Sequence, residues 1–193
     1  MKFNGDGQEP LKTDLFLASF FCFLGGMMKT CSFFGHRDTP QTEELKERIR
    51  GTVERLIVEE KTDTFLFGSR SQFDELCHIV VTELKELYPY ISRIAYLCKH
   101  ETACLVGIGM KTRQSIRIIA GQEIYVGEYE EIRKSNKINS AGKACYIERN
   151  QWIICDSDFV IIRNQQAGKA QKKSGTNYAL EYAIAQEKEI IYL

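Results

Sequence analysis

Short apolar runs alternate with amphipathic stretches along most of the chain. The first apolar run covers residues 31–34 and stops at Gly35-His36-Arg37. In the stretch that follows, 41–60, the apolar residues recur at helical spacing: Leu45, Ile49, Val53, Leu56 and Ile57. This pattern predicts a buried strand followed by a helix that packs on a sheet. Thr39-Pro40 predicts the helix start, with the threonine as cap and the proline in the first turn.

The same unit then recurs. An apolar run over 64–67 is broken at Gly68-Ser69, and Ser71 and Asp74 stand three residues apart, as in a capping box. A second helical stripe follows, which comprises Phe73, Leu76, Cys77, Val80, Leu84 and Leu87. The pattern predicts a strand and then a helix that carries His78 on its flank and ends at Pro89, with a third strand over 91–97.

The second half of the chain continues this alternation. Its pattern predicts helices over 141–155 and 175–187 and strands over 159–162 and 190–193, with possible short strands over 115–119 and 123–126. Gly107-Ile108-Gly109 is interpreted as a loop, because the third glycine of a dinucleotide fingerprint is absent. Alternating strands and helices imply right-handed crossovers, and therefore an α/β fold with a mainly parallel central sheet.

Composition limits the classes of function. The 193 residues suit one domain, predicted over 29–193, and the 26 basic and 26 acidic residues balance, which argues against nucleic-acid or membrane partners. An odd number of cysteines, seven, predicts reduced thiols in a cytoplasmic protein. Cys98, His100 and Cys104 lack the paired spacing of a metal site, so neither a metal nor a cofactor is predicted.

Residues 1–28 form an apolar amino-terminal extension. Its run over 15–28 is shorter than the roughly 20 residues that span a bilayer, and acidic residues precede it. The favoured interpretation is that translation starts at Met27 or Met28, and the alternative is a membrane or secretion role.

Candidate binding residues follow three of the predicted strands. In a parallel sheet, ligands bind beyond the carboxyl ends of the strands, where the amino termini of helices favour anions. Glycine, hydroxyl or basic residues suited to that role lie at three junctions: Gly35-His36-Arg37, Gly68-Ser69-Arg70-Ser71 and Ser174-Gly175-Thr176. Before the third junction and just beyond it, residues 159–180 include no acidic residue but four basic ones, Arg163, Lys169, Lys172 and Lys173. A phosphate-bearing ligand is therefore predicted, and the alternative is that these residues form solvated turns.

These junctions carry a resemblance to a known superfamily. Residues 31–37, Cys-Ser-Phe-Phe-Gly-His-Arg, are similar to a strand and turn of the YpsA-like branch of the SLOG superfamily, which includes DprA (Smf) and the Lonely Guy proteins. Gly68 and Asp74 resemble parts of its Gly-Gly-Ala-x-Gly-x-Asp motif. Glu148-Arg149-Asn150 with Asp158 resembles a further motif, and Gly175-Thr176 matches the end of its phosphate turn.

The resemblance implies a Rossmann-like three-layer domain that binds a nucleotide or nucleotide-derived molecule and commonly forms homodimers. Lonely Guy enzymes cleave the N-glycosidic bond of nucleoside monophosphates with an arginine and a glutamate. Arg149 matches that arginine, but Ala179 occupies the glutamate position, and Glu181 is predicted to point elsewhere. Asp74 and Glu75 are the candidate replacement carboxylates, and the alternative is that they only satisfy backbone donors at the start of their helix.

Three functions follow as hypotheses. The first is binding or sensing of a nucleotide-derived ligand, with Arg149 stabilising its charge. The second is hydrolysis of a nucleoside monophosphate by Arg149 with Asp74 or Glu75. The third is single-stranded DNA binding, as in DprA. This function requires a basic surface along the DNA, which the balanced charge of the chain does not indicate. Trp152 and Tyr146 are predicted to lie in the core rather than to stack on bases.

Overall fold

Parallel strands form the centre of the protein. The computed structural model describes residues 28–68, 71–98, 116–119, 122–125, 129–134, 143–163 and 174–193. Six parallel strands form one sheet in the order β6-β3-β2-β1-β7-β8. Their bounds are β1 Lys29–Gly35, β2 Thr62–Phe67, β3 Ser92–Leu97, β6 Glu131–Lys134, β7 Phe159–Arg163 and β8 Glu189–Tyr192. Two further strands, β4 (Ile116–Ile119) and β5 (Gln122–Tyr125), form an antiparallel pair of their own.

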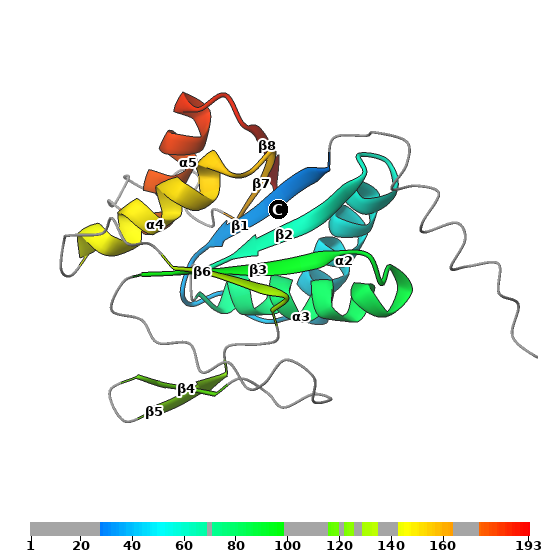
Figure 1. Ribbon diagram of the computed structural model, residues 1–193, viewed down its shortest axis with the longest axis horizontal. Coiled ribbons are helices and arrows are strands. Elements are labelled where there is room, and N and C mark those ends of the chain that lie inside the picture. Colours follow the sequence, from blue (N-terminus) through cyan, green and yellow to red (C-terminus); the bar gives the residue numbers. More distant parts are fainter. Residues whose placement is uncertain are drawn as a thin grey trace, which may run out of the picture.

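Helices cover both faces of the sheet. α2 (Glu43–Val58) and α3 (Gln72–Leu87) lie on one face, and α4 (Lys143–Cys155) and α5 (Gly175–Ala185) lie on the other (Figure 1). The protein therefore has the predicted α/β, Rossmann-like three-layer fold with a parallel central sheet. The predicted short strands near 115–119 and 123–126 correspond to β4 and β5.

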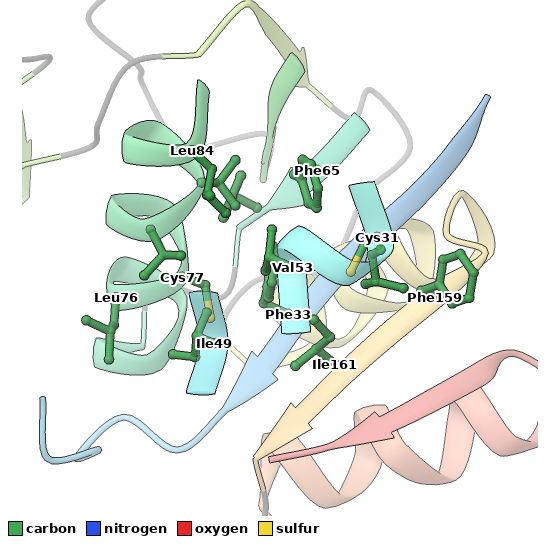
Figure 2. Packing of buried hydrophobic residues seen from close by; sticks show 14 of the residues in the cluster. Cys31, Phe33, Ile49, Val53, Phe65, Leu76, Cys77, Leu84, Phe159 and Ile161 are labelled. Carbon is green, nitrogen blue, oxygen red and sulfur yellow. The ribbon is translucent and has the colours of Figure 1, made fainter. Parts of the chain in front are cut away.

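Each face of the sheet supports a separate hydrophobic cluster. In β1, Cys31 and Phe33 point toward α2 and α3, whereas Phe34 points toward α4 and α5. Figure 2 shows part of the first cluster, in which Phe33 and Phe65 of the sheet belong to the same buried group as Ile49 and Val53 of α2. Burying each such aromatic or aliphatic side chain contributes about 1.5–3 kcal/mol, so these clusters hold the layers together.

The start of α2 differs from the prediction. Thr42, not Thr39, caps this helix, because its hydroxyl oxygen accepts a hydrogen bond from the backbone N–H of Leu45 at 3.2 Å. Thr39 is fully buried and its hydroxyl donates to the backbone oxygen of His36 at 2.9 Å. The threonine and proline therefore belong to the turn after β1 rather than to the helix.

Two side chains of α3 also differ from the prediction. His78 is buried rather than on a flank, and its ring packs against Phe67 and Tyr129 with centroid distances of 5.0 and 4.8 Å. Leu87, predicted in the apolar stripe, is 67% exposed because it is the last residue of the helix.

The edge strand β6 is not predicted by the hydrophobic pattern, because its sequence, Glu-Ile-Arg-Lys, is short and mostly polar. An ion pair helps to hold it beside β3. Glu130, just before β6, accepts hydrogen bonds from Nη2 of Arg93 at 2.7 Å and from the backbone N–H of Arg93 at 2.6 Å. The Arg93 side chain is buried, so this pair is shielded from solvent more than a surface ion pair.

Residues 1–27, the predicted amino-terminal extension apart from Met28, lie outside the described part of the chain. Within the described ranges, none of the helices combines the length and the apolar character that crossing a membrane requires.

Gly35 provides a test of the packing between β1 and α3. A Cβ atom at Gly35 would lie 2.4 Å from Cγ of Phe73, whereas one at Gly51 in α2 would meet nothing within 4 Å. We expect Gly35→Ala to lower the free energy of unfolding by about 1–3 kcal/mol through overpacking. The control Gly51→Ala should raise it by about 0.5–1 kcal/mol, because alanine favours a helix. Urea unfolding measures both, and equal stability of the two variants would contradict this packing.

Glu130 provides a test of the ion pair through pH. Burial raises the pKa of this carboxyl, but hydrogen bonds from Arg93 outweigh burial, and the pKa lies below its ordinary value of 4.5. A carboxyl with a lowered pKa stabilises the folded state above its unfolded pKa, and this stabilisation is lost as pH falls through the folded pKa. Glu130→Gln should therefore be less stable than wild type at about pH 7, and the difference should shrink toward about pH 3.

Urea unfolding across this pH range measures the difference, and Glu181→Gln is the control, because Glu181 is exposed on α5. A stability difference between Glu130→Gln and wild type that stays constant with pH would show that the ion pair does not contribute.

Candidate functional site

The carboxyl ends of the strands share one edge, because all six strands of the main sheet are parallel. The strand order reverses at the neighbouring pair β1 and β7: the chain proceeds from β1 outward to β6, and then from β7 outward to β8. The last residues of these two strands, Gly35 and Arg163, are opposite each other in the ladder. Helices α2 and α5, the next helices after these strands, lie on opposite faces of the sheet. A reversal of this kind is where open α/β sheets bind ligands.

The first predicted junction contacts the start of α3, the helix that follows the second junction. The backbone N–H of Gln72, the first residue of α3, donates a hydrogen bond to the backbone oxygen of Arg37 at 3.1 Å. Phe73 packs so closely on Gly35 that no side chain fits at that position. The turn after β1 is thereby fixed against the amino terminus of α3. The side chain of His36 is half-buried and that of Arg37 is exposed.

Arg149 lies against the second junction from the opposite face of the sheet. A Cβ atom at Gly68 would be 2.9 Å from the backbone oxygen of Tyr96 and 3.4 Å from Cδ of Arg149. Glycine is favoured here because a Cβ would come too close to the backbone of β3, whereas the stem of Arg149 lies at ordinary contact distance from this position. The structure thus brings together two residues that are 81 positions apart (149 − 68) and that were predicted separately as site residues.

The guanidinium group of Arg149 is held within the protein. The residue is 2% exposed, and Cζ lies 5.4 Å from the centre of the Tyr146 ring. Its Nη2 also donates to Oδ1 of Asn150 at 3.4 Å. Tyr146 packs against the buried Cys98 and Cys145. A cation that is oriented by an aromatic face and shielded from water acts on a nearby anion more strongly than a solvated one.

The third junction begins α5. Ser174 caps this helix, because its hydroxyl oxygen accepts a hydrogen bond from the backbone N–H of Asn177 at 3.1 Å. Gly175 is exposed and Thr176 is buried. No acidic residue lies in the first turn of α5, whereas the first turns of α2 and α3 each carry acidic residues: Glu43, Glu44, Asp74 and Glu75. The partial positive charge at the start of α5 is therefore not offset by a carboxylate of its own first turn.

The two candidate carboxylates have different surroundings. Asp74 is 7% exposed at the start of α3, and Glu75 is exposed. Burial raises the pKa of the neighbouring Cys77 thiol, and the charge of Asp74 raises it further. Of the pair, Asp74 therefore lies inside the protein at this edge of the sheet and Glu75 faces solvent.

The other positions considered for catalysis lie elsewhere. Ala179 is buried in the cluster beneath α4 and α5, whereas Glu181 is exposed, so the two residues point in different directions as predicted. Asp158 lies at the start of β7, where its carboxylate accepts a hydrogen bond from the backbone N–H of Thr30 at 2.7 Å. Asp158 therefore joins the amino-terminal ends of β1 and β7, at the opposite edge from Arg149.

Trp152 of α4 is half-buried and packs against the core, where its ring meets that of the buried Tyr96 edge-on with centroids 4.7 Å apart. Ser69 and Arg70, together with Lys169, Lys172 and Lys173, lie outside the described residues, as do His100, Cys104 and Gly107-Ile108-Gly109.

Arg163 was predicted only as one of the four basic residues around the third junction, and its place opposite Gly35 comes from the structure. It ends β7 directly opposite Gly35, and its Nε atom is buried with no acceptor among the residues that the structure describes. The available signal is the basic residue immediately after a buried apolar strand. The sequence alone does not show that this arginine lies opposite Gly35, because that requires the pairing of β7 with β1.

No protein-family model and no curated protein matches the chain.

Proposed function

We propose that the protein binds a nucleotide or nucleotide-derived molecule at the carboxyl edge of its sheet, around the ends of β1, β2 and β7. The observation that carries this proposal is the reversal of strand order between β1 and β7, with Gly35 opposite Arg163. Ligands of open α/β sheets bind where such a reversal separates the loops on the two faces.

The chemistry of the edge favours an anionic ligand. Arg163 ends β7, the buried Arg149 lies against the end of β2, and the amino terminus of α5 adds partial positive charge. Arginine guanidinium groups and helix amino termini are common ligands of phosphate. Gly35 and Gly68 allow the neighbouring elements to approach closely. The resemblance of these segments to SLOG motifs supports a nucleotide as the carrier of the anionic group.

Thermal unfolding with adenosine and guanosine monophosphates, and with cyclic nucleotides, tests the proposal. At a hundredfold excess over the dissociation constant, a binding nucleotide stabilises the protein by about 2.7 kcal/mol, a rise in melting temperature of roughly 5–10 °C. Arg149→Met should reduce this rise to about 1 °C, because binding about a hundredfold weaker leaves about 0.4 kcal/mol. Methionine retains an unbranched stem that can pack beside Gly68.

Arg48→Met is the matched control, since it removes one arginine from the exposed side of α2. It should retain the full rise in melting temperature. An equal rise in melting temperature in Arg149→Met and Arg48→Met would show that Arg149 does not contact the nucleotide. No rise in melting temperature with any of these nucleotides in the wild-type protein would refute nucleotide binding.

Hydrolysis of a nucleoside monophosphate is the second candidate function, and the burial of Asp74 at this edge is the observation that favours it. In this reaction water replaces the base at the sugar carbon, and a carboxylate stabilises the positive charge that develops on the sugar. If hydrolysis occurs, incubation with adenosine monophosphate should release free adenine. Asp74→Asn should abolish this release and retain the nucleotide-dependent rise in melting temperature.

The exposed Glu75 gives the control, Glu75→Gln, which should leave the rate of base release unchanged. Absence of free base in the wild-type protein, together with a clear rise in melting temperature, would leave binding as the function and exclude hydrolysis of that nucleotide.

A further inference from the structure

Arg163 stands at the point where the two halves of the sheet meet. It is the last residue of β7, and its ladder partner Gly35 is the last residue of β1. Because Gly35 has no side chain, Arg163 supplies the only side chain of this pair of residues. The side chain of Arg163 therefore occupies the junction from which the chain leads to opposite faces of the sheet.

The strand geometry gives the direction of this side chain. Side chains alternate between the faces of a strand, and Phe159 and Ile161 of β7 belong to the cluster beneath α2 and α3. Arg163, two residues beyond Ile161, leaves the sheet on the same face as they do. That is also the face on which Phe73 of α3 closes over Gly35.

One atom of the Arg163 side chain, Nε, is buried although the residue lies at a strand end. The residue as a whole is half-buried, but its Nε atom is shielded from solvent, and none of the described residues accepts a hydrogen bond from it. The described part of the chain supplies no carboxylate that forms an ion pair with Arg163. Buried donors of charged groups are costly to leave without an acceptor, so proteins rarely retain them without a use.

We infer that Arg163 binds the phosphate of the ligand and makes the site select a nucleoside monophosphate over the uncharged nucleoside. This inference rests on the proposed function, because it concerns the same edge of the sheet. A guanidinium group matches a phosphate through two parallel hydrogen bonds, one of which Nε can donate. The start of α5 lies at the same edge but on the opposite face of the sheet, and its first turn has no acidic residue, so it also favours an anion.

The test compares the affinity of the full chain for adenosine monophosphate and for adenosine by calorimetry. The wild-type protein should bind the monophosphate at least about tenfold more tightly than the nucleoside, since a charged hydrogen bond is worth about that factor. Arg163→Gln removes the charge and should weaken monophosphate binding by about tenfold or more, while adenosine binding stays within about twofold. The preference for the phosphate should thus be lost.

Arg48→Gln is the matched control on the exposed side of α2, and it should retain the wild-type preference. Arg163→Lys keeps the charge but lacks Nε, so it should retain a reduced preference. Circular dichroism of each variant without ligand shows whether it folds. If Arg163→Gln does not fold, the preference of Arg163→Lys for the monophosphate is the test of the inference. A wild-type preference in Arg163→Lys would then overturn the inference.

The two possible failures are distinguishable. Absence of any binding of adenosine monophosphate or adenosine to the wild-type protein contradicts the proposed function for this nucleotide and the role of Arg163 with it. Binding of the monophosphate to the wild-type protein with an unchanged preference in Arg163→Gln overturns the role of Arg163 alone.

Discussion

The parallel pairing of β1 with β7 is the constraint on which the site depends. These strands are neighbours in the sheet but are separated in the chain by eight elements, from α2 to α4. At their amino-terminal ends they are joined by hydrogen bonds between Thr30, the second residue of β1, and Asp158, which immediately precedes β7; one runs from the backbone N–H of Asp158 to the hydroxyl oxygen of Thr30 at 3.0 Å. Because the register is fixed at this edge, it also places Gly35 opposite Arg163 at the other edge.

Packing on both faces then fixes what surrounds this pair. On one face, Phe73 of α3 closes over Gly35, and the backbone of α3 binds the turn that contains Arg37. On the other face, the stem of Arg149 lies beside Gly68, and α5 begins with a serine cap and no acidic residue in its first turn. The basic groups are therefore positioned by the same contacts that stabilise the fold.

The sequence predicted the parts of the fold that depend on local patterns. Continuous apolar runs located β1, β2, β3 and β7, and helical stripes located α2 and α3. The polar edge strand β6 was missed. The cap of α2 was predicted wrongly as Thr39, because the hydroxyl of Thr39 donates to the backbone oxygen of His36 instead. The junction glycines were found from the chain alone. The contact between Gly68 and Arg149 and the position of Arg163 could not be found, because both depend on strand order and on packing between distant segments.

The most direct measurement of the central claim is an NMR titration of the isotope-labelled protein with adenosine monophosphate, followed through its backbone amide signals. If the nucleotide binds at the carboxyl edge, the largest changes in chemical shift occur at 35–37, 68, 163 and 174–176. Changes confined to the opposite edge, around Thr30 and Asp158, or to the exposed sides of α2 and α3, would contradict binding at the carboxyl edge.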